Sequence, residues 1–120
     1  MKLIDFHVHR YFDYLTVLVF ALAPLALPLG GTPAAICWIL AIVHLLLTFL
    51  TRPSKEGRGS ISFVLHGFIE LAVALALILS PWIFGFAPGS RARIFFMAAG
   101  GVIFAAWLLT DYAGRGIDRV

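Results

Sequence analysis

Long apolar runs alternate along this chain with short clusters of glycine, proline, serine and charged residues. Four of these runs approach or exceed the length of about 20 residues that an α-helix needs to cross a membrane. They cover residues 11–29, 34–50, 61–84 and 93–110. Unpaired backbone groups are costly in lipid, so the glycine and proline clusters belong near the membrane interfaces. The pattern predicts an all-α fold, a four-helix transmembrane bundle with short turns.

Composition supports the same fold class. Hydrophobic residues make up 62% of the 120 residues and charged residues only 12%, whereas soluble domains have about 45–50% and about 25%. This excludes a soluble enzyme, a secreted disulfide scaffold and a disordered chain. The single cysteine, Cys37, cannot form an internal disulfide, and we expect it to fill space in the second helix as a small apolar group. We predict one membrane domain over residues 1–120.

The distribution of basic residues predicts an orientation in the membrane. An even number of spans places both termini and the central loop on one side, and seven of the nine basic residues lie there: Lys2, Arg10, Arg52, Lys55, Arg58, Arg115 and Arg119. Basic residues favour the cytoplasmic side, so we predict cytoplasmic termini in a cell (inner) membrane. We expect Arg91 and Arg93 to anchor the outer end of the fourth helix. These basic residues at the membrane interfaces account for the net charge of +3, so the charge does not require a nucleic-acid partner.

The chain divides into two hairpins of similar plan. Residues 11–51 form the first and residues 61–112 the second, and the basic loop 52–60 joins them. Both hairpins start on the same side, so we predict parallel repeats related about an axis along the membrane normal.

The second hairpin contains the tripeptide Ser80-Pro81-Trp82, followed by Gly85 and a second apolar helix. Over residues 66–110 it resembles the SPW-repeat family of small bacterial membrane proteins. The resemblance implies a pair of membrane-embedded helical hairpins and implies almost nothing about function. The first hairpin has Ala23-Pro24-Leu25 or Leu27-Pro28-Leu29 instead, so it resembles a degenerate copy.

The tripeptide also has a physical interpretation. Pro81 lacks an N–H, so we expect it to bend or end the third helix near the outer interface. Ser80 can then donate a hydrogen bond to a carbonyl one turn back. Trp82 suits the interface between lipid and water, and Gly85 permits the chain to reverse.

Apart from Asp13 and Arg93 near the ends of their runs, three ionisable groups lie within the apolar runs, where a charge costs about 2.5–3.5 kcal/mol on insertion scales. They are His44, His66 and Glu70, at about 10, 7–8 and 13 Å from the cytoplasmic helix ends. His66 and Glu70 are four residues apart and therefore share one helix face. We predict that the three groups meet inside the bundle, together with Thr48.

Several functions remain open for this cluster. It can be a polar clasp that holds the hairpins in register, or a site that handles protons or ions. His44 and His66 can also ligate haem, and the two histidines with Glu70 can ligate a metal.

Two further features have structural interpretations. Residues 1–12 mix apolar and charged side chains, so we predict a short interfacial segment in which His7 and His9 are solvated. Ala98, Gly101 and Ala105 form a stripe of small residues on the fourth helix. We expect this stripe to admit a close neighbour within the bundle, with Ala72 and Ala76 as the partner face, and docking of a second copy as the alternative.

The chain contains no phosphate-binding loop, nucleophile elbow or paired-carboxylate motif. We therefore predict a structural or accessory membrane protein that is not an enzyme and has no cofactor. Its expected partners are the lipid bilayer and either further copies of itself or a larger membrane complex. The alternatives are a proton- or ion-handling element and a haem- or metal-binding redox subunit.

Overall fold

The computed structural model describes residues 2–52 and 60–113. Four helices dominate this part of the chain: α1 (Phe6–Ala26), α2 (Gly31–Leu50), α3 (Phe63–Phe84) and α4 (Arg91–Leu109). The all-α prediction is confirmed, with one small addition. Two-residue strands β1 (Thr51–Arg52) and β2 (Ile61–Ser62) pair in parallel, with Thr51 opposite Ile61. Most of the predicted basic loop, residues 53–59, lies outside the described residues.

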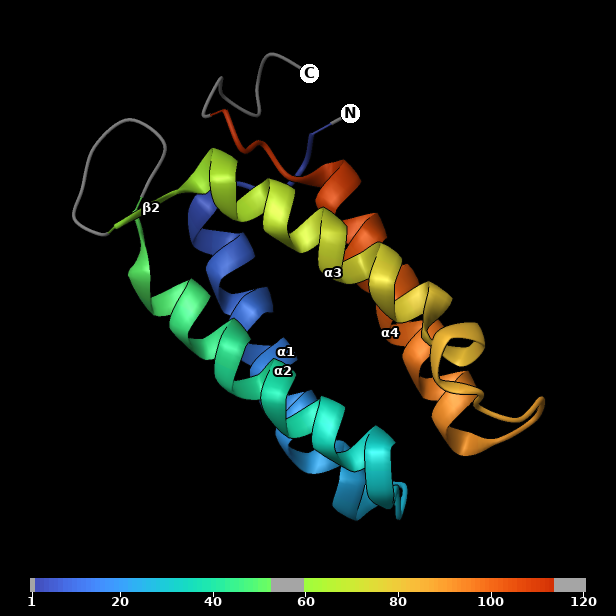
Figure 1. Ribbon diagram of the computed structural model, residues 1–120. Helices are drawn as coiled ribbons and strands as arrows, with labels where there is room; N and C mark the ends of the chain where they lie inside the picture. Colours follow the sequence, from blue (N-terminus) through green and yellow to red (C-terminus); the bar gives the residue numbers. More distant parts are fainter. Residues whose placement is uncertain (1, 53–59, 114–120) are drawn as a thin grey trace.

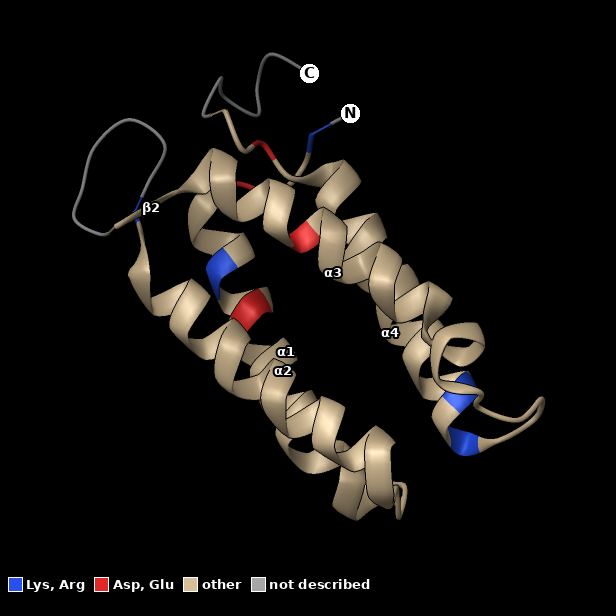
Figure 2. Ribbon diagram, in the orientation of Figure 1, with Lys and Arg blue, Asp and Glu red and all other residues tan. Residues whose placement is uncertain are grey.

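The helices pack as two hairpins, α1 against α2 and α3 against α4. Figure 1 shows the first and last described residues at the same end of the molecule as β2, with both hairpin turns at the opposite end. Charged residues gather near the two ends of the structure, and the long middle stretches of the helices carry few (Figure 2). The chain therefore brings polar chemistry from several distant segments to one end.

Three helices, α2, α3 and α4, are long and apolar enough to cross a membrane. The fourth predicted span, α1, has 21 residues but is not among these three helices; it contains Arg10 and Asp13. The predicted start of this helix was also wrong. The side chain of Asp5 accepts a hydrogen bond from the backbone N–H of Val8 and caps a helix that begins at Phe6. Residues 6–12 are thus the first turns of α1 and not a separate interfacial segment.

Pro81 lies inside α3 and does not end it. The helix continues to Phe84 and stops at Gly85, whose left-handed conformation (φ 70°) lets its N–H bond to the carbonyl of Pro81. The Ser80 hydroxyl donates to the carbonyl of Leu77, one turn back as expected. Trp82 is exposed, and the Arg93 guanidinium lies 4.8 Å from its ring centre.

Helices α1 and α3 share a register of equivalent positions that are 57 residues apart. The matching pairs are the caps Asp5 and Ser62, Phe6 and Phe63, His9 and His66, Asp13 and Glu70, and Pro24 and Pro81. In this register Ala23-Pro24-Leu25 is the counterpart of Ser80-Pro81-Trp82. The two hairpins thus repeat their acidic, histidine and proline positions even where the residue types differ.

The predicted small-residue stripe does not face α3, because Ala98, Gly101 and Ala105 are all exposed. The close approach occurs at Gly100. A Cβ on Gly100 would lie 2.8 Å from the carbonyl oxygen of Ala74, so the two backbones meet there. The face of α4 is therefore rotated by one residue from the prediction.

Candidate cation site

Four buried polar side chains converge between α1 and α3: His9, Asp13, His66 and Glu70. Their exposed fractions are 1% or less. Each helix contributes one histidine and, four residues later, one carboxylate, so both side chains of a pair project from one helix face. We call these four residues the central cluster.

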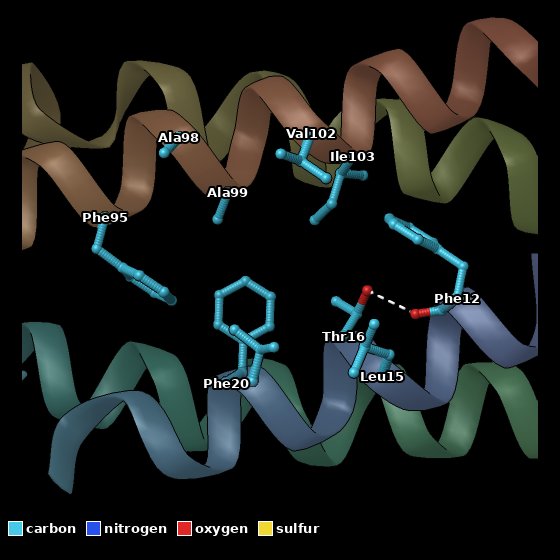
Figure 3. Close-up of a pocket in the computed structure, with 10 residues that line it drawn as sticks. Phe12, Leu15, Thr16, Phe20, Phe95, Ala98, Ala99, Val102 and Ile103 are labelled. Atoms are coloured by element: carbon cyan, nitrogen blue, oxygen red, sulfur yellow. Dashed lines mark hydrogen bonds between the residues drawn. The ribbon is translucent and has the colours of Figure 1, made fainter. Parts of the chain in front are cut away.

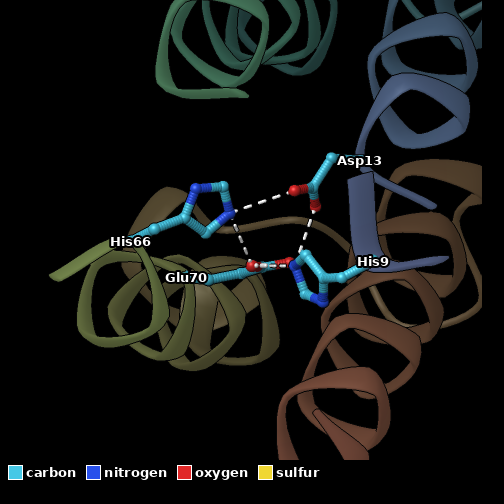
Figure 4. A group of neighbouring side chains, drawn as sticks. All are labelled: His9, Asp13, His66 and Glu70. Atoms are coloured by element: carbon cyan, nitrogen blue, oxygen red, sulfur yellow. Dashed lines mark hydrogen bonds and ion pairs between the residues drawn. The ribbon is translucent and has the colours of Figure 1, made fainter. Parts of the chain in front are cut away.

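The central cluster alternates imidazoles and carboxylates around a common centre (Figure 4). The Nε2 atom of His9 lies 2.8 Å from Glu70 Oε2 and 3.1 Å from Asp13 Oδ1. The Nε2 atom of His66 lies 3.0 Å from Asp13 Oδ2 and 3.1 Å from Glu70 Oε2. Each histidine therefore contacts the carboxylate of its own helix and that of the other helix.

His66 Nε2 is close to both carboxylates yet meets hydrogen-bond geometry with neither of them, nor with any other described residue. Asp13 Oδ1 and Glu70 Oε1 likewise have no hydrogen-bond partner in the described part of the chain. Buried polar atoms are normally satisfied, because an unpaired one costs about 1–3 kcal/mol. The geometry of these buried atoms does not allow every one of them a hydrogen bond. A positive charge shared between the carboxylates therefore explains the arrangement better than a set of separate hydrogen bonds does.

A threonine at the end of a helix holds the other nitrogen of each imidazole. Thr51 follows α2 and lies 2.8 Å from His66 Nδ1. Thr110 follows α4 and lies 2.9 Å from His9 Nδ1. Each threonine thus contacts the histidine of the other hairpin, which gives the two hairpins reciprocal contacts.

The threonines also fix the proton on each imidazole. The Thr51 hydroxyl donates to the carbonyl of Leu47, and the Thr110 hydroxyl donates to the carbonyl of Ala106 at 2.6 Å. A hydroxyl has only one proton, so each threonine oxygen must accept the Nδ1–H of its histidine. Both Nε2 atoms, which face the carboxylates, then require a proton or a metal ion.

His44 reaches the edge of the central cluster. It is buried in α2, and its Nε2 lies 3.6 Å from Asp13 Oδ1. Thr48 is buried too, but its hydroxyl donates to the carbonyl of His44 in its own helix. Of the predicted cluster, His66 thus contacts Glu70 directly. His44 contacts Asp13, which the prediction did not include. The Thr48 hydroxyl bonds to the backbone of its own helix and to no side chain of the central cluster.

Tyr112 covers the cluster from the carboxyl-terminal side. Its hydroxyl donates to Glu70 Oε2 at 3.3 Å, and its ring lies against Gly67, where a Cβ would come within 2.9 Å of ring carbons. Burial raises the pKa of the Tyr112 phenol, and the negative charges of Glu70 and Asp13 raise it further. Tyr112 thus stays a neutral hydrogen-bond donor to the carboxylate.

The amino-terminal segment closes the same end of the molecule. Ile4 pairs with Thr110, in the same parallel sense in which Ile61 pairs with Thr51. The rings of Phe6 and Phe63 meet edge to face, with their centres 5.0 Å apart. These contacts separate the cluster from the end of the bundle.

Two cavities differ sharply in their chemistry. A small one of about 10 Å³ is lined by His9, Asp13 and His66 among others, and such a volume holds one water-sized group. A larger one, of about 280 Å³, lies between α1 and α4 (Figure 3). Its single hydroxyl, on Thr16, already donates to the carbonyl of Phe12, so of these two cavities the small one offers reactive groups.

The sequence prediction missed most of this site. It placed His9 in solvent, whereas His9 is fully buried, and it did not include Asp13, Thr51, Thr110 or Tyr112. His7, its neighbour, is exposed as expected. Alignment of the two halves on Pro24 and Pro81 would have revealed the second histidine–carboxylate pair.

Comparison with known proteins gives no further guide, because no protein-family model, curated protein or solved structure matches this chain. The chemistry of the central cluster is therefore the basis for assigning a function.

Proposed function

We propose that this chain is an integral membrane protein whose functional centre, the central cluster, binds cations. One observation carries the proposal. Both Nε2 atoms face two buried carboxylates, while both Nδ1 atoms face threonine oxygens whose protons go to backbone carbonyls. Two carboxylates and two imidazoles in this state need two positive charges to be neutral, and burial makes an uncompensated charge expensive.

In this proposal α1 is a fourth span in an inner membrane, and both termini are cytoplasmic. The apolar character of α2, α3 and α4 supports the membrane location. Pairing with α3 offsets the cost of Asp13 in α1. Among the described residues, Lys2, Arg10 and Arg52 lie toward the end that carries residues 2 and 113, and Arg91 and Arg93 begin α4 at the opposite end (Figure 1). Kinship to the SPW-repeat family remains part of the proposal and rests on Ser80-Pro81-Trp82.

The proposed role belongs to the ion-handling class and not to the purely structural one. A polar clasp needs complete hydrogen bonding, which gives a cluster its rigidity, but Glu70 Oε1 and Asp13 Oδ1 have no such partner among the described residues. We do not propose haem ligation, because the cavity beside His66 has room for one water-sized group.

The test is nitrogen NMR on histidine-labelled protein in lipid nanodiscs at neutral pH, after chelator treatment and removal of any affinity tag. We expect protons on both nitrogens of His9 and of His66, because protons then supply the positive charge. Exposed His7 is the internal control, and His9→Gln and His66→Gln assign the signals. A bare nitrogen in either imidazole, in protein that also binds no added Co²⁺, would show a neutral clasp and contradict the proposal.

A further inference from the structure

We propose that the central cluster is a site for one divalent first-row transition-metal ion. The ligands are Nε2 of His9, Nε2 of His66, and the carboxylates of Asp13 and Glu70. This inference rests on the proposed function and names the class of cation that the site takes. The two carboxylates balance the charge of a divalent ion, so the occupied site is neutral.

The donor atoms have the spacing of a coordination sphere. One ligand atom from each residue lies within 4.8 Å of all the others, and neighbouring nitrogen and oxygen atoms are 2.8–3.1 Å apart. A tetrahedral ion with bonds of about 2.1 Å separates its ligands by about 3.4 Å. To admit a tetrahedral ion, neighbouring donors must therefore move apart by a few tenths of an ångström, and pairs that lie farther apart than about 3.4 Å must move closer.

The contacts behind the ligands are those of a metal site. A ligating histidine usually donates its second N–H to an oxygen, which fixes the ring and its tautomer. Thr51 and Thr110 accept these bonds, and Tyr112 donates to the Glu70 carboxylate. These contacts hold three of the four ligands, His9, His66 and Glu70, in place before an ion arrives.

Two further observations point to an ion at this position. Of the four buried side-chain atoms without a hydrogen-bond partner in the described part of the chain, Asp13 Oδ1, His66 Nε2 and Glu70 Oε1 belong to the cluster. The fourth, His44 Nε2, lies 3.6 Å from Asp13 Oδ1 at its edge. The small cavity of about 10 Å³ touches both ligating histidines, and it can hold a water molecule as an additional ligand.

The ligand types define the class of metal. Imidazole and carboxylate suit zinc, iron, cobalt or manganese ions, whereas copper(I) favours thiolate and thioether ligands. Cys37, the only cysteine, lies in α2 and is not part of the cluster. An all-oxygen site would suit magnesium or calcium, and the two imidazoles argue against those ions.

The experiment uses Co²⁺ as the probe, with the full-length, tag-free protein in lipid nanodiscs. We expect one Co²⁺ per chain, with the intense visible bands of a four- or five-coordinate ion and displacement by Zn²⁺. X-ray absorption on the same wild-type sample should show nitrogen and oxygen ligands that include two imidazoles. His9→Gln and Glu70→Gln should each weaken Co²⁺ binding at least 100-fold, and the matched control His7→Gln should leave it unchanged.

The outcomes separate this inference from the proposed function. No Co²⁺ binding by the wild type, or equal binding by His9→Gln and His7→Gln, would overturn the metal site. If Co²⁺ fails to bind while NMR finds both imidazoles fully protonated, the cluster binds protons alone and the cation-binding function stands. The wild-type spectra decide the matter even if a ligand variant does not fold.

Discussion

At the residue scale, the decisive feature of this molecule is the use of one hydroxyl for two bonds. Thr51 donates to its own helix and accepts from His66, and Thr110 does the same for His9. Neither threonine is charged or unusual in sequence, yet together they set the chemical state of the cluster. The position of the proton on each imidazole is therefore set by two threonines that no sequence motif identifies.

Replacement of Thr51 by valine tests the hydrogen bond that the Thr51 hydroxyl oxygen accepts from His66 Nδ1. Thr51→Val keeps the shape of the side chain but leaves the Nδ1–H of His66 buried without an acceptor, so we expect a loss of about 1–3 kcal/mol of unfolding free energy. Chemical unfolding in detergent measures it. The matched control is Thr48→Val, because Thr48 bonds only to the carbonyl of His44 in its own helix. Equal losses in the two variants would contradict the role given to Thr51.

The sequence predicted some residues of the site and missed others for a physical reason. His66 and Glu70 stand out because they interrupt an apolar run. His9 and Asp13 lie near the start of α1 among other charged residues, where a polar side chain normally faces water. They are buried by contacts from both hairpins, including His66 and Glu70 of α3 and Thr110 after α4. These contacts are a tertiary property that the local pattern does not contain.

At the scale of the helix, the apolar pattern predicted which segments are helical and roughly how long they are. It did not predict which face each helix turns toward its neighbour. The apolar runs predicted the helices because lipid-length segments have few alternatives. The face that α4 turns to α3 depends on how side chains interlock. Small residues surround Gly100 on several sides of this helix, and the pattern therefore could not distinguish Gly100 from Gly101.

A pair of glycine variants tests this rotation. Gly100→Ala places a Cβ against the backbone of α3, so we expect the helices to separate at a cost of about 1–3 kcal/mol. Gly101→Ala meets nothing within 4 Å and should be neutral, or stabilising by up to about 1 kcal/mol through helix propensity. Thermal unfolding of the two variants gives the comparison. If Gly101→Ala is the more damaging change, the assigned packing face is wrong.

At the scale of the whole molecule, the two hairpins meet where the chain begins and ends. Lys2 donates to the carbonyl of Leu108, and the backbone N–H groups of Leu3 and Ile4 both donate to that of Leu109. The N–H of Asp111 donates back to the carbonyl of Ile4. These bonds join residues 2–4 to residues 108–111 directly beside the central cluster.

The proposed topology makes a prediction about accessibility. In a Cys37→Ala background, Lys2→Cys and Ala113→Cys should react with a membrane-impermeant maleimide only from the cytoplasmic side, because four spans place both ends there. Ala87→Cys, in the turn between α3 and α4, should react only from the opposite side. Labelling of intact and lysed cells measures this. Opposite sides for residues 2 and 113 would show that α1 does not span the membrane.

The hydrogen bond between His9 and Thr110 also sets the earliest time during synthesis at which the central cluster can assemble. The two residues are separated by 101 positions in the chain, and ribosomes add about 5–20 residues per second. For about 5–20 s after its synthesis, α1 thus carries a histidine and an aspartate whose partners have not all been made. In the proposed topology, the stable insertion of α1 in the bilayer therefore waits for α3 and α4, although α1 is the first helix to be synthesised. A chain released before residue 110 would contain every apolar segment and still lack a finished centre.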